Sequence, residues 1–447
     1  MITLFPCNYI PGFMKPAAVS INRHVVRRAL FVGMVLHLAC LMPVSAGPAA
    51  AIYTGMTEKQ VSQGEIEEPG TPETKPFQLS VFPMVGTEGV HSHKYLYRMS
   101  LNVFAGVTGG VDGVELGGFL NINRYSMTGL QASGFGNISG GVTEGVQFSG
   151  FFNVSGSGVK GVQGSGFINI VNGDSRVLQG AGFGNVISGN VKGAQGSGFA
   201  SIVSGSFEGI QASGFGSITG GRMSGIQLAG FAGLAGEIDG IQGSGFINIA
   251  GNVEGVQASG FLNIAGKVKG VQIGAVNIAD SVDGVPIGLV SIVRDGYRKM
   301  EVWGGDAMNT GIGFKTGISR FYNFLTVGTQ FSGNNTVISY GYGFGSEFNL
   351  HDDRYLNVEL LSHHMMEDRW WRFERINTLN QLRVTFATDL DDRWQFFAGP
   401  VLNVQVIRKG NEDNNGGKIA PYHILEYSSR HADTWVWAGI NAGFRFW

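Results

Sequence analysis

The stretch VEGVQASGFLNIAGKVKGVQ, residues 253–272, decides the fold, because its last residues begin to repeat its first ones. The same phrase returns as GIQGSGFINI, GIQASGFGSI, GVQGSGFINI and GVQFSGFFNV. A Gln anchors each copy, with Glu115 in the slot before the first Gln and Pro286 in the slot after the last. The anchors follow one another at 16 residues for seven steps, then 15 for three, then 14. Twelve copies at a period of 14 to 16 residues indicate a repeat architecture.

Three positions of each copy carry the repeated chemistry. In most copies a Phe follows the Gln by four residues, and an Asn follows the Phe by two, with Ser201, Ser217, Gly233 and Ser291 as substitutes for the Asn. We predict that equivalent residues stack into structural ladders, represented by Gln131, Gln147, Gln163, Gln211 and Gln257, by Phe135, Phe151, Phe167, Phe246 and Phe261, and by Asn137, Asn153, Asn169, Asn248 and Asn263.

The composition of the unit favours a β-solenoid. Each unit holds four or five Gly, and each Gly costs about 1 kcal/mol relative to Ala in a helix. An antiparallel meander would bring identical residues together only by accident, whereas a solenoid stacks every coil on an identical one every ~4.8 Å. Stacked Gln and Asn then form amide ladders. Eleven steps predict a rod of about 50 Å.

The inward-facing residues are predicted from hydrophobicity. We expect the Ile or Val before each Gln and the Ile or Val after each Asn to form the core. The Phe ladder is assigned to the core as well, and the alternative is an exposed aromatic stripe that binds glycan or lipid.

After the repeats, longer alternating strands predict a small outer-membrane-type β-barrel of about eight strands. In 337–350, Tyr340 and Phe344 share a face suited to lipid, and Gly341 and Gly343 share a narrow interior face. The same alternation predicts strands at 309–319, 322–332, 354–366, 372–388, 393–408 and 434–447. Aromatic girdles are assigned to Trp303, Trp370, Trp371, Trp394, Trp435 and Trp437. The final strand, INAGFRFW, ends in aromatic residues as bacterial barrels do.

Seven strands need an eighth to close the sheet, because an open edge is not tolerated in lipid. Two segments compete for this place, KMEVWGG at 299–305 and FQLSVFPMV at 77–85. The first would leave the rod in the periplasm, and the second would insert it between barrel strands and raise it on the cell surface. We favour 77–85 and the cell surface.

The amino-terminal region predicts export. Arg27 and Arg28 precede the apolar run ALFVGMVLHLACLMPV, and VSA ends a cleavage site at Ala46; an uncleaved anchor is the alternative. The predicted organisation is a signal peptide at 1–46, a flexible linker at 47–75, initial strands at 76–110, solenoid repeats at 111–295 and a barrel at 296–447.

Composition argues against several functions. The formal net charge is -2 and only 14% of the residues are charged, so the chain lacks the excess of basic residues that nucleic-acid binding needs. Both cysteines, Cys7 and Cys40, fall in the predicted signal peptide. The His pairs at 91–93 and 363–364 lack Cys or carboxylates at ligand spacing. We therefore predict no catalytic residues, no metal and no cofactor.

The segment GVQIGAVNIADSVDGVPIGLVSIVRDGYRKMEVWG, residues 270–304, resembles the surface repeat-containing proteins of Gram-negative bacteria, in which VQIGLVNIA-type units precede a strand-rich carboxyl-terminal region. The resemblance implies an envelope location and no established activity. The expected function is structural, adhesive or ligand-binding, with outer-membrane lipid as one partner and a glycan or an envelope protein as another. The alternative is a channel or transport component whose repeats add strands to a larger barrel.

Overall fold

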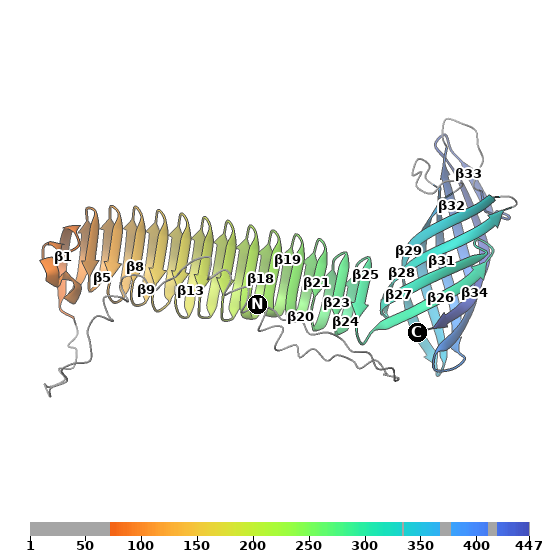
Figure 1. The fold of residues 1–447 in the computed structure, drawn as a ribbon, viewed down its shortest axis with the longest axis horizontal. Coiled ribbons are helices and arrows are strands. Elements are labelled where there is room, and N and C mark those ends of the chain that lie inside the picture. The colour runs from red at the N-terminus through yellow and green to blue at the C-terminus, as the bar shows by residue number, and fades with distance from the viewer. Residues whose placement is uncertain (1–71, 333–334, 367–376, 410–417, 447) are drawn as a thin grey trace, which may run out of the picture. The chain divides into compact units, whose positions relative to one another are not determined.

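The computed structural model describes residues 72–447 apart from 333–334, 367–376, 410–417 and 447, and strands dominate it (Figure 1). The predicted signal peptide lies outside the described residues. In the described part of the chain, no helix is long and apolar enough to cross a membrane. The helix found there is the short 3-10 turn η1, Gly89–Lys94.

The repeats form the predicted solenoid, which runs from orange to green in Figure 1. One row of strands carries the Gln positions: β3 Leu96–Asn102, β5 Gly110–Gly117, β7 Met127–Ser133, β9 Thr143–Ser149, β11 Val159–Ser165, β13 Ser175–Ala181, β15 Val191–Ser197, β17 Phe207–Ser213, β22 Lys267–Ile273 and β24 Ser281–Ile287. A second row carries the Asn positions: β4 Ala105–Thr108, β6 Leu120–Asn123, β8 Gly136–Ser139, β10 Phe152–Ser155, β12 Ile168–Val171, β14 Gly184–Ile187, β16 Ala200–Val203, β21 Leu262–Ile264, β23 Val276–Ala279 and β25 Val290–Val293. Three strands span both rows: β18 Gly216–Ala229, β19 Ala232–Ser244 and β20 Ile247–Ser259.

Strand pairing has the register that the repeat predicts. Each strand pairs in parallel with its equivalent one coil away, so that Gln163 lies between Gln147 and Gln179, and Asn153 lies beside Asn169. The first coil is extended by β1, Thr74–Phe82, which pairs in parallel with β3 and antiparallel with β2, Val85–Gly86. Identical residues therefore stack along the rod, as a solenoid requires.

The burial of the ladders corrects the predicted core. The Gln and Asn side chains are buried, whereas Val162 and Ile170, beside them in the sequence, lie on the outer faces of the two rows. The prediction that the Ile or Val before Gln and after Asn form the core is therefore wrong. Apolar core residues lie instead four residues before the Gln and eight after it, next to the turn opposite the Phe: Val159, Val171, Ile187, Val191, Val203, Phe207, Met223, Ile238, Val253 and Val268.

Two of the repeated glycines are required by the close stacking of coils. Gly145, two residues before its Gln, has a φ of 116°, and a Cβ there would lie 2.2 Å from the carbonyl oxygen of Gly129. Gly150, in the turn before Phe151, would bring a Cβ within 2.0 Å of the carbonyl oxygen of Gly134. A side chain at either position would push adjacent coils apart, which explains the GVQ and SGF phrases.

The carboxyl-terminal strands form a closed antiparallel barrel of eight, with one further strand outside it. The barrel strands are β26 Tyr297–Gly305, β27 Thr310–Ile318, β28 Phe321–Ser332, β29 Asn335–His351, β30 Arg354–Met366, β31 Asn377–Asp389, β32 Trp394–Arg408 and β34 Ala432–Phe446, and β33 Leu425–Ser428 pairs with β34 from outside the barrel. The predicted alternation in 337–350 is confirmed, because Tyr340 and Phe344 face outward and Gly341 and Gly343 are buried.

Two barrel predictions are wrong. The closing strand is β26, which pairs with both β27 and β34, whereas 77–85 contributes to β1 and β2 of the solenoid. Trp303, Trp435 and Trp437 are buried in the barrel interior and form no girdle. Trp394 is exposed at the start of β32, and Trp370 and Trp371 lie outside the described residues. A large ring in a narrow eight-stranded barrel fills space that water would otherwise occupy.

Candidate functional site

The Gln ladder runs through the solenoid interior as a continuous chain of amide hydrogen bonds. Each Gln donates its Nε2 to the Oε1 of the Gln one coil earlier, at distances from 2.6 Å between Gln147 and Gln131 to 3.1 Å between Gln211 and Gln195. The ladder continues without a break to Gln257 and Gln272. Each interior amide thus acts as donor and acceptor at once, which removes most of the cost of burying it.

The Asn ladder runs parallel to the first with the opposite direction of donation. Asn137 donates its Nδ2 to Asn153 of the following coil at 2.9 Å, and Asn153 donates to Asn169 at 2.9 Å. The same amide also donates to a backbone carbonyl, which is that of Phe148 for Asn137. Ser201, Ser217 and Gly233 interrupt this ladder, and it resumes where Asn248 donates to Asn263 at 3.3 Å.

The first slot of the Gln ladder holds an acid. Glu115 is fully buried, and it accepts hydrogen bonds from Gln131 at 2.7 Å and from Asn102 at 3.1 Å. Burial raises the pKa of the Glu115 carboxyl to about 7, although the hydrogen bonds from Gln131, Asn123 and Asn102 act in the opposite direction. This carboxyl therefore titrates near neutral pH in the folded protein.

The Phe ladder lies at the surface, so its assignment to the core is wrong and the rings form an exposed stripe. Eleven rings from Phe104 to Phe261 stack with centroids 4.5 to 5.2 Å apart. Phe135 and Phe167 are half-buried, while Phe151, Phe246 and Phe261 keep 42 to 46% of their surface exposed. We call this row of rings the Phe edge.

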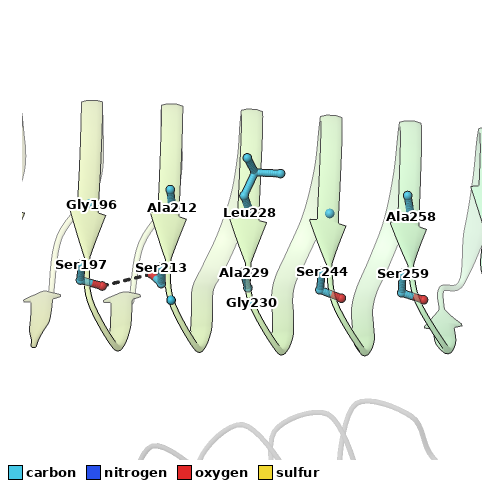
Figure 2. A pocket seen from close by; sticks show the side chains of 12 residues that line it. Gly196, Ser197, Ala212, Ser213, Leu228, Ala229, Gly230, Ser244, Ala258 and Ser259 are labelled. Carbon is cyan, nitrogen blue, oxygen red and sulfur yellow. Dashed lines mark hydrogen bonds between the residues drawn. The ribbon is translucent and has the colours of Figure 1, made fainter.

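A shallow groove runs beside the Phe edge, on the outer face of the strands that carry the Gln residues. One section of it has a volume of about 780 Å³, and Figure 2 shows its floor, made mostly of small residues. The section is lined by Gly196, Ser197, Ala212, Ser213, Gly214, Leu228, Ala229, Gly230, Gly243, Ser244, Ala258 and Ser259. The groove therefore offers apolar contact and few hydrogen-bonding groups.

The barrel interior holds a buried cluster of charges that sequence reasoning missed. Glu301 contacts Lys315 at 2.5 Å, Arg383 at 2.6 Å and Arg445 at 2.7 Å, and all four side chains are fully buried. Glu359 contacts the same three cations at 2.5 to 3.7 Å. The signal was present in the sequence, because these charged residues stand beside outward apolar residues in their strands, as Glu301 does between Met300 and Val302.

Apolar layers fill more of the barrel interior around this cluster. One layer holds Trp303, Phe324, Leu361, Ala387 and Phe397. A second holds Met308, Val337, Met365, Leu379, Ile419, Trp435 and Trp437, where Asp306 accepts a 2.6 Å hydrogen bond from the Trp437 indole. The solenoid strands pair among themselves and none joins the barrel sheet. The described barrel is therefore a packed body of eight strands, and the repeats do not enlarge it.

The two His pairs noted in the sequence, at 91–93 and 363–364, do not lie in a metal-ligand cluster. The described residues contain no group of three His, Cys, Asp or Glu placed to hold a metal. His363 is buried in the barrel with its Nδ1 3.3 Å from the Thr326 hydroxyl. His93 contacts the backbone carbonyl of Val90 through its Nδ1 at 2.9 Å. Comparison with known proteins found no matching family model, no matching curated protein and no matching solved structure.

Proposed function

We propose that this protein is a non-enzymatic structural component of the bacterial outer membrane, in which the barrel is a sealed anchor and the solenoid is a rod attached to one end of it. The observation that carries the proposal is the contrast between the two sides of the barrel wall. Phe314, Leu325 and Phe344 face outward, while the interior is packed with rings and paired charges. An apolar exterior suits lipid, and an eight-stranded barrel is just wide enough for side chains to fill.

The strand order supports a periplasmic solenoid. Three residues, 294–296, separate the end of β25 from the start of β26. Met300 of β26 pairs with Phe446 of β34, so the solenoid joins the barrel at the end that holds the carboxyl terminus. The connections at that end are all short, at 319–320, 352–353 and 390–393. The other end has two short connections, at 306–309 and 333–334, and the two longest ones, at 367–376 and 409–424. Short turns are typical of the periplasmic side of such barrels. The resemblance of 270–304 to an envelope family supports a location in the cell envelope, and by itself it points to the cell surface rather than the periplasm.

Two measurements on the purified full chain test the anchor. An intact barrel should migrate faster in a gel before boiling than after it, and the protein in planar bilayers should show no conductance steps above the lipid baseline. Absence of the migration shift would argue against a membrane barrel. Stable conductance steps would instead support a transport function and overturn the sealed anchor.

An epitope tag in the solenoid turn at residues 188–190 tests the side of the membrane. Antibody labelling only after the outer membrane is permeabilised supports the periplasmic solenoid. Labelling of intact cells would instead show that the solenoid lies on the cell surface. A second tag in the connection at 410–417, which we expect outside the cell, is the matched control, since it should be labelled on intact cells.

A further inference from the structure

The Phe edge presents ring edges to the solvent and hides the ring faces. Neighbouring rings are nearly parallel, with interplanar angles of 2° between Phe119 and Phe135 and 13° between Phe246 and Phe261. Each face is therefore covered by the next ring along the rod. Sugar rings bind aromatic side chains through their faces, so this arrangement disfavours a glycan. An edge made of aromatic C–H groups suits aliphatic chains, with which it makes apolar contact.

Two glycines have no structural reason to be glycine, namely Gly196 in the groove floor and Gly180, which pairs with it one coil earlier and extends the same row of outward positions. A Cβ at Gly180 or Gly196 would meet nothing within 4 Å, and neither residue has the positive φ that favours glycine. They contrast with Gly145, where a Cβ would strike the preceding coil. A strand glycine with open space above it often marks the close approach of another molecule. Gly180 and Gly196 leave the groove floor flat beside Phe183 and Phe199.

Charges on the solenoid gather away from the Phe edge, at the start of the Gln-bearing strands. We call this row the charged edge. It carries exposed ion pairs between successive coils, namely Lys160 with Glu144, Lys192 with Glu208, Arg222 with Asp239 and Lys269 with Glu254. The two turns of each coil lie at opposite ends of its strands, so the rod is amphipathic along its whole length. The outer faces between the two edges carry Leu178, Ile210 and Ile249, which are also exposed.

The backbone at the Phe edge is already satisfied. The amide of each Phe donates to the carbonyl oxygen of the Phe one coil earlier, as Phe135 does to Phe119 at 2.9 Å and Phe199 does to Phe183 at 2.8 Å. Unpaired backbone groups are what exclude most irregular structure from hydrocarbon. A turn whose N–H groups bond along the rod can enter an acyl layer at little polar cost.

We propose that the Phe edge and its groove rest in the acyl layer of the membrane that anchors the barrel, with the charged edge facing water. The inference rests on the proposed function, because the barrel brings the solenoid to a bilayer: only residues 294–296 separate β25 from β26. Lipid is favoured over a second copy because the groove and the Phe edge lack the Tyr, Trp and Arg side chains that dominate protein interfaces. An amphipathic rod of this kind would lie in the interface plane.

Single cysteines in one coil test the proposal. In the full chain with Cys7→Ser and Cys40→Ser, Phe199→Cys places a label on the Phe edge, and Lys192→Cys places one on the charged edge of the same coil. Each variant, labelled with an environment-sensitive fluorophore, is reconstituted in phosphatidylethanolamine–phosphatidylglycerol vesicles containing acyl-brominated lipid. We expect emission at residue 199 to fall about two-fold with brominated lipid, since an interfacial face sits about 5–10 Å deep, and iodide to quench residue 192.

Quenching of both labels by iodide, with no effect of brominated lipid, would overturn the proposal. Protection of residue 199 that depends on protein density and ignores brominated lipid would also overturn it, in favour of a second copy. The gel-migration shift of the barrel is measured on the same vesicles. Without that shift the proposed function falls, whereas a normal shift with residue 199 in water refutes this inference alone.

A second pair of variants changes the groove floor and keeps the label at residue 199 as the reporter. Gly180→Lys with Gly196→Lys places charges on the groove floor, where open space admits the side chains without repacking. This double variant should reduce lipid quenching of the label at residue 199 about two-fold or more, because charges at an acyl layer are costly. The control Ser224→Lys adds charge on the charged edge, in register with Glu208, and should leave the quenching unchanged.

Discussion

Gln131 donates a 2.7 Å hydrogen bond from its side-chain amide to the carboxylate of Glu115, whereas the next rung joins Gln147 to a second amide. The Gln ladder therefore ends on a titratable group inside the rod. No cation contacts Glu115 among the partners described for it, which are the amides of Gln131, Asn102 and Asn123 and the hydroxyl of Ser100. The stability of the first coils should consequently depend on pH.

Glu115→Gln should remove that dependence. The folded-state pKa of about 7 lies above the unfolded value of about 4.3, so between these pH values the folded state holds a proton that the unfolded state has released. The contribution is fully favourable below the unfolded pKa, and it is lost as pH rises toward 7 at up to about 1.4 kcal/mol per pH unit. Hydrogen exchange of residues 96–139, corrected for the intrinsic rate, should show this loss in the wild type and a flat profile in Glu115→Gln. Identical profiles would contradict the prediction.

Breaking the Gln ladder should cost more than trimming the aliphatic residue beside it. Gln163→Ala leaves the Oε1 of Gln147 without its 2.6 Å donor and the Nε2 of Gln179 without its 2.6 Å acceptor, both in the interior. Unsatisfied buried polar groups cost about 1–3 kcal/mol each, so we expect a loss on the order of 3 kcal/mol. The control Val162→Ala, on the outer face, should cost below about 1 kcal/mol. The opening free energies of the two variants are measured by hydrogen exchange. A larger loss in Val162→Ala than in Gln163→Ala would show that the aliphatic residues, and not the Gln ladder, form the core.

A whole coil should be removable. Deletion of 242–256 joins Ile241 to Gln257 and keeps the 15-residue register that relates β19 to β20. Because each coil contacts only its neighbours, the variant should fold with a rod shorter by about 4.8 Å. Deletion of eight residues from the same place shifts every ladder and should abolish folding of the solenoid. Far-ultraviolet circular dichroism and electron microscopy of the purified variants distinguish these outcomes, and equal damage from both deletions would refute independent coils.

Neutralising Glu301 should destabilise the barrel strongly. Glu301→Gln removes the carboxylate that Lys315, Arg383 and Arg445 share, and leaves Glu359 to balance three buried cations. Breaking a buried ion pair costs about 3–5 kcal/mol, so the folded gel band should convert to the unfolded one at a lower temperature than in the wild type. The neighbouring control Met300→Leu points outward and should convert near the wild-type temperature. Equal conversion temperatures for the two variants would show that the cluster does not support the barrel.

Much of the fold was predictable from the sequence because its signals are local or periodic. Parallel stacking was predicted from the phrase repeated around Gln257, because only coils stacked in register bring each residue into contact with its equivalent in the next coil. Alternation in 337–350 predicted both the strand and its outward face, because a narrow barrel needs Gly341 and Gly343 inside. The closing strand was not predictable in this way. Both 77–85 and 299–305 alternate acceptably, and the choice depends on which of them reaches β34 in space.

The repeat by itself determined that Gln163 and Val162 point to opposite sides of a strand, but not which of them points inward. Only the tertiary structure decided that. Hydrophobicity assigns the interior to Val162, and for a single coil that assignment would be right, because a lone buried amide loses its hydrogen bonds with water. When coils stack, Gln163 meets Gln147 on one side and Gln179 on the other, and both of its amide groups are satisfied. The burial cost disappears because each Gln bonds to neighbours sixteen residues away in either direction, and Val162 and the Phe edge are left on the outside.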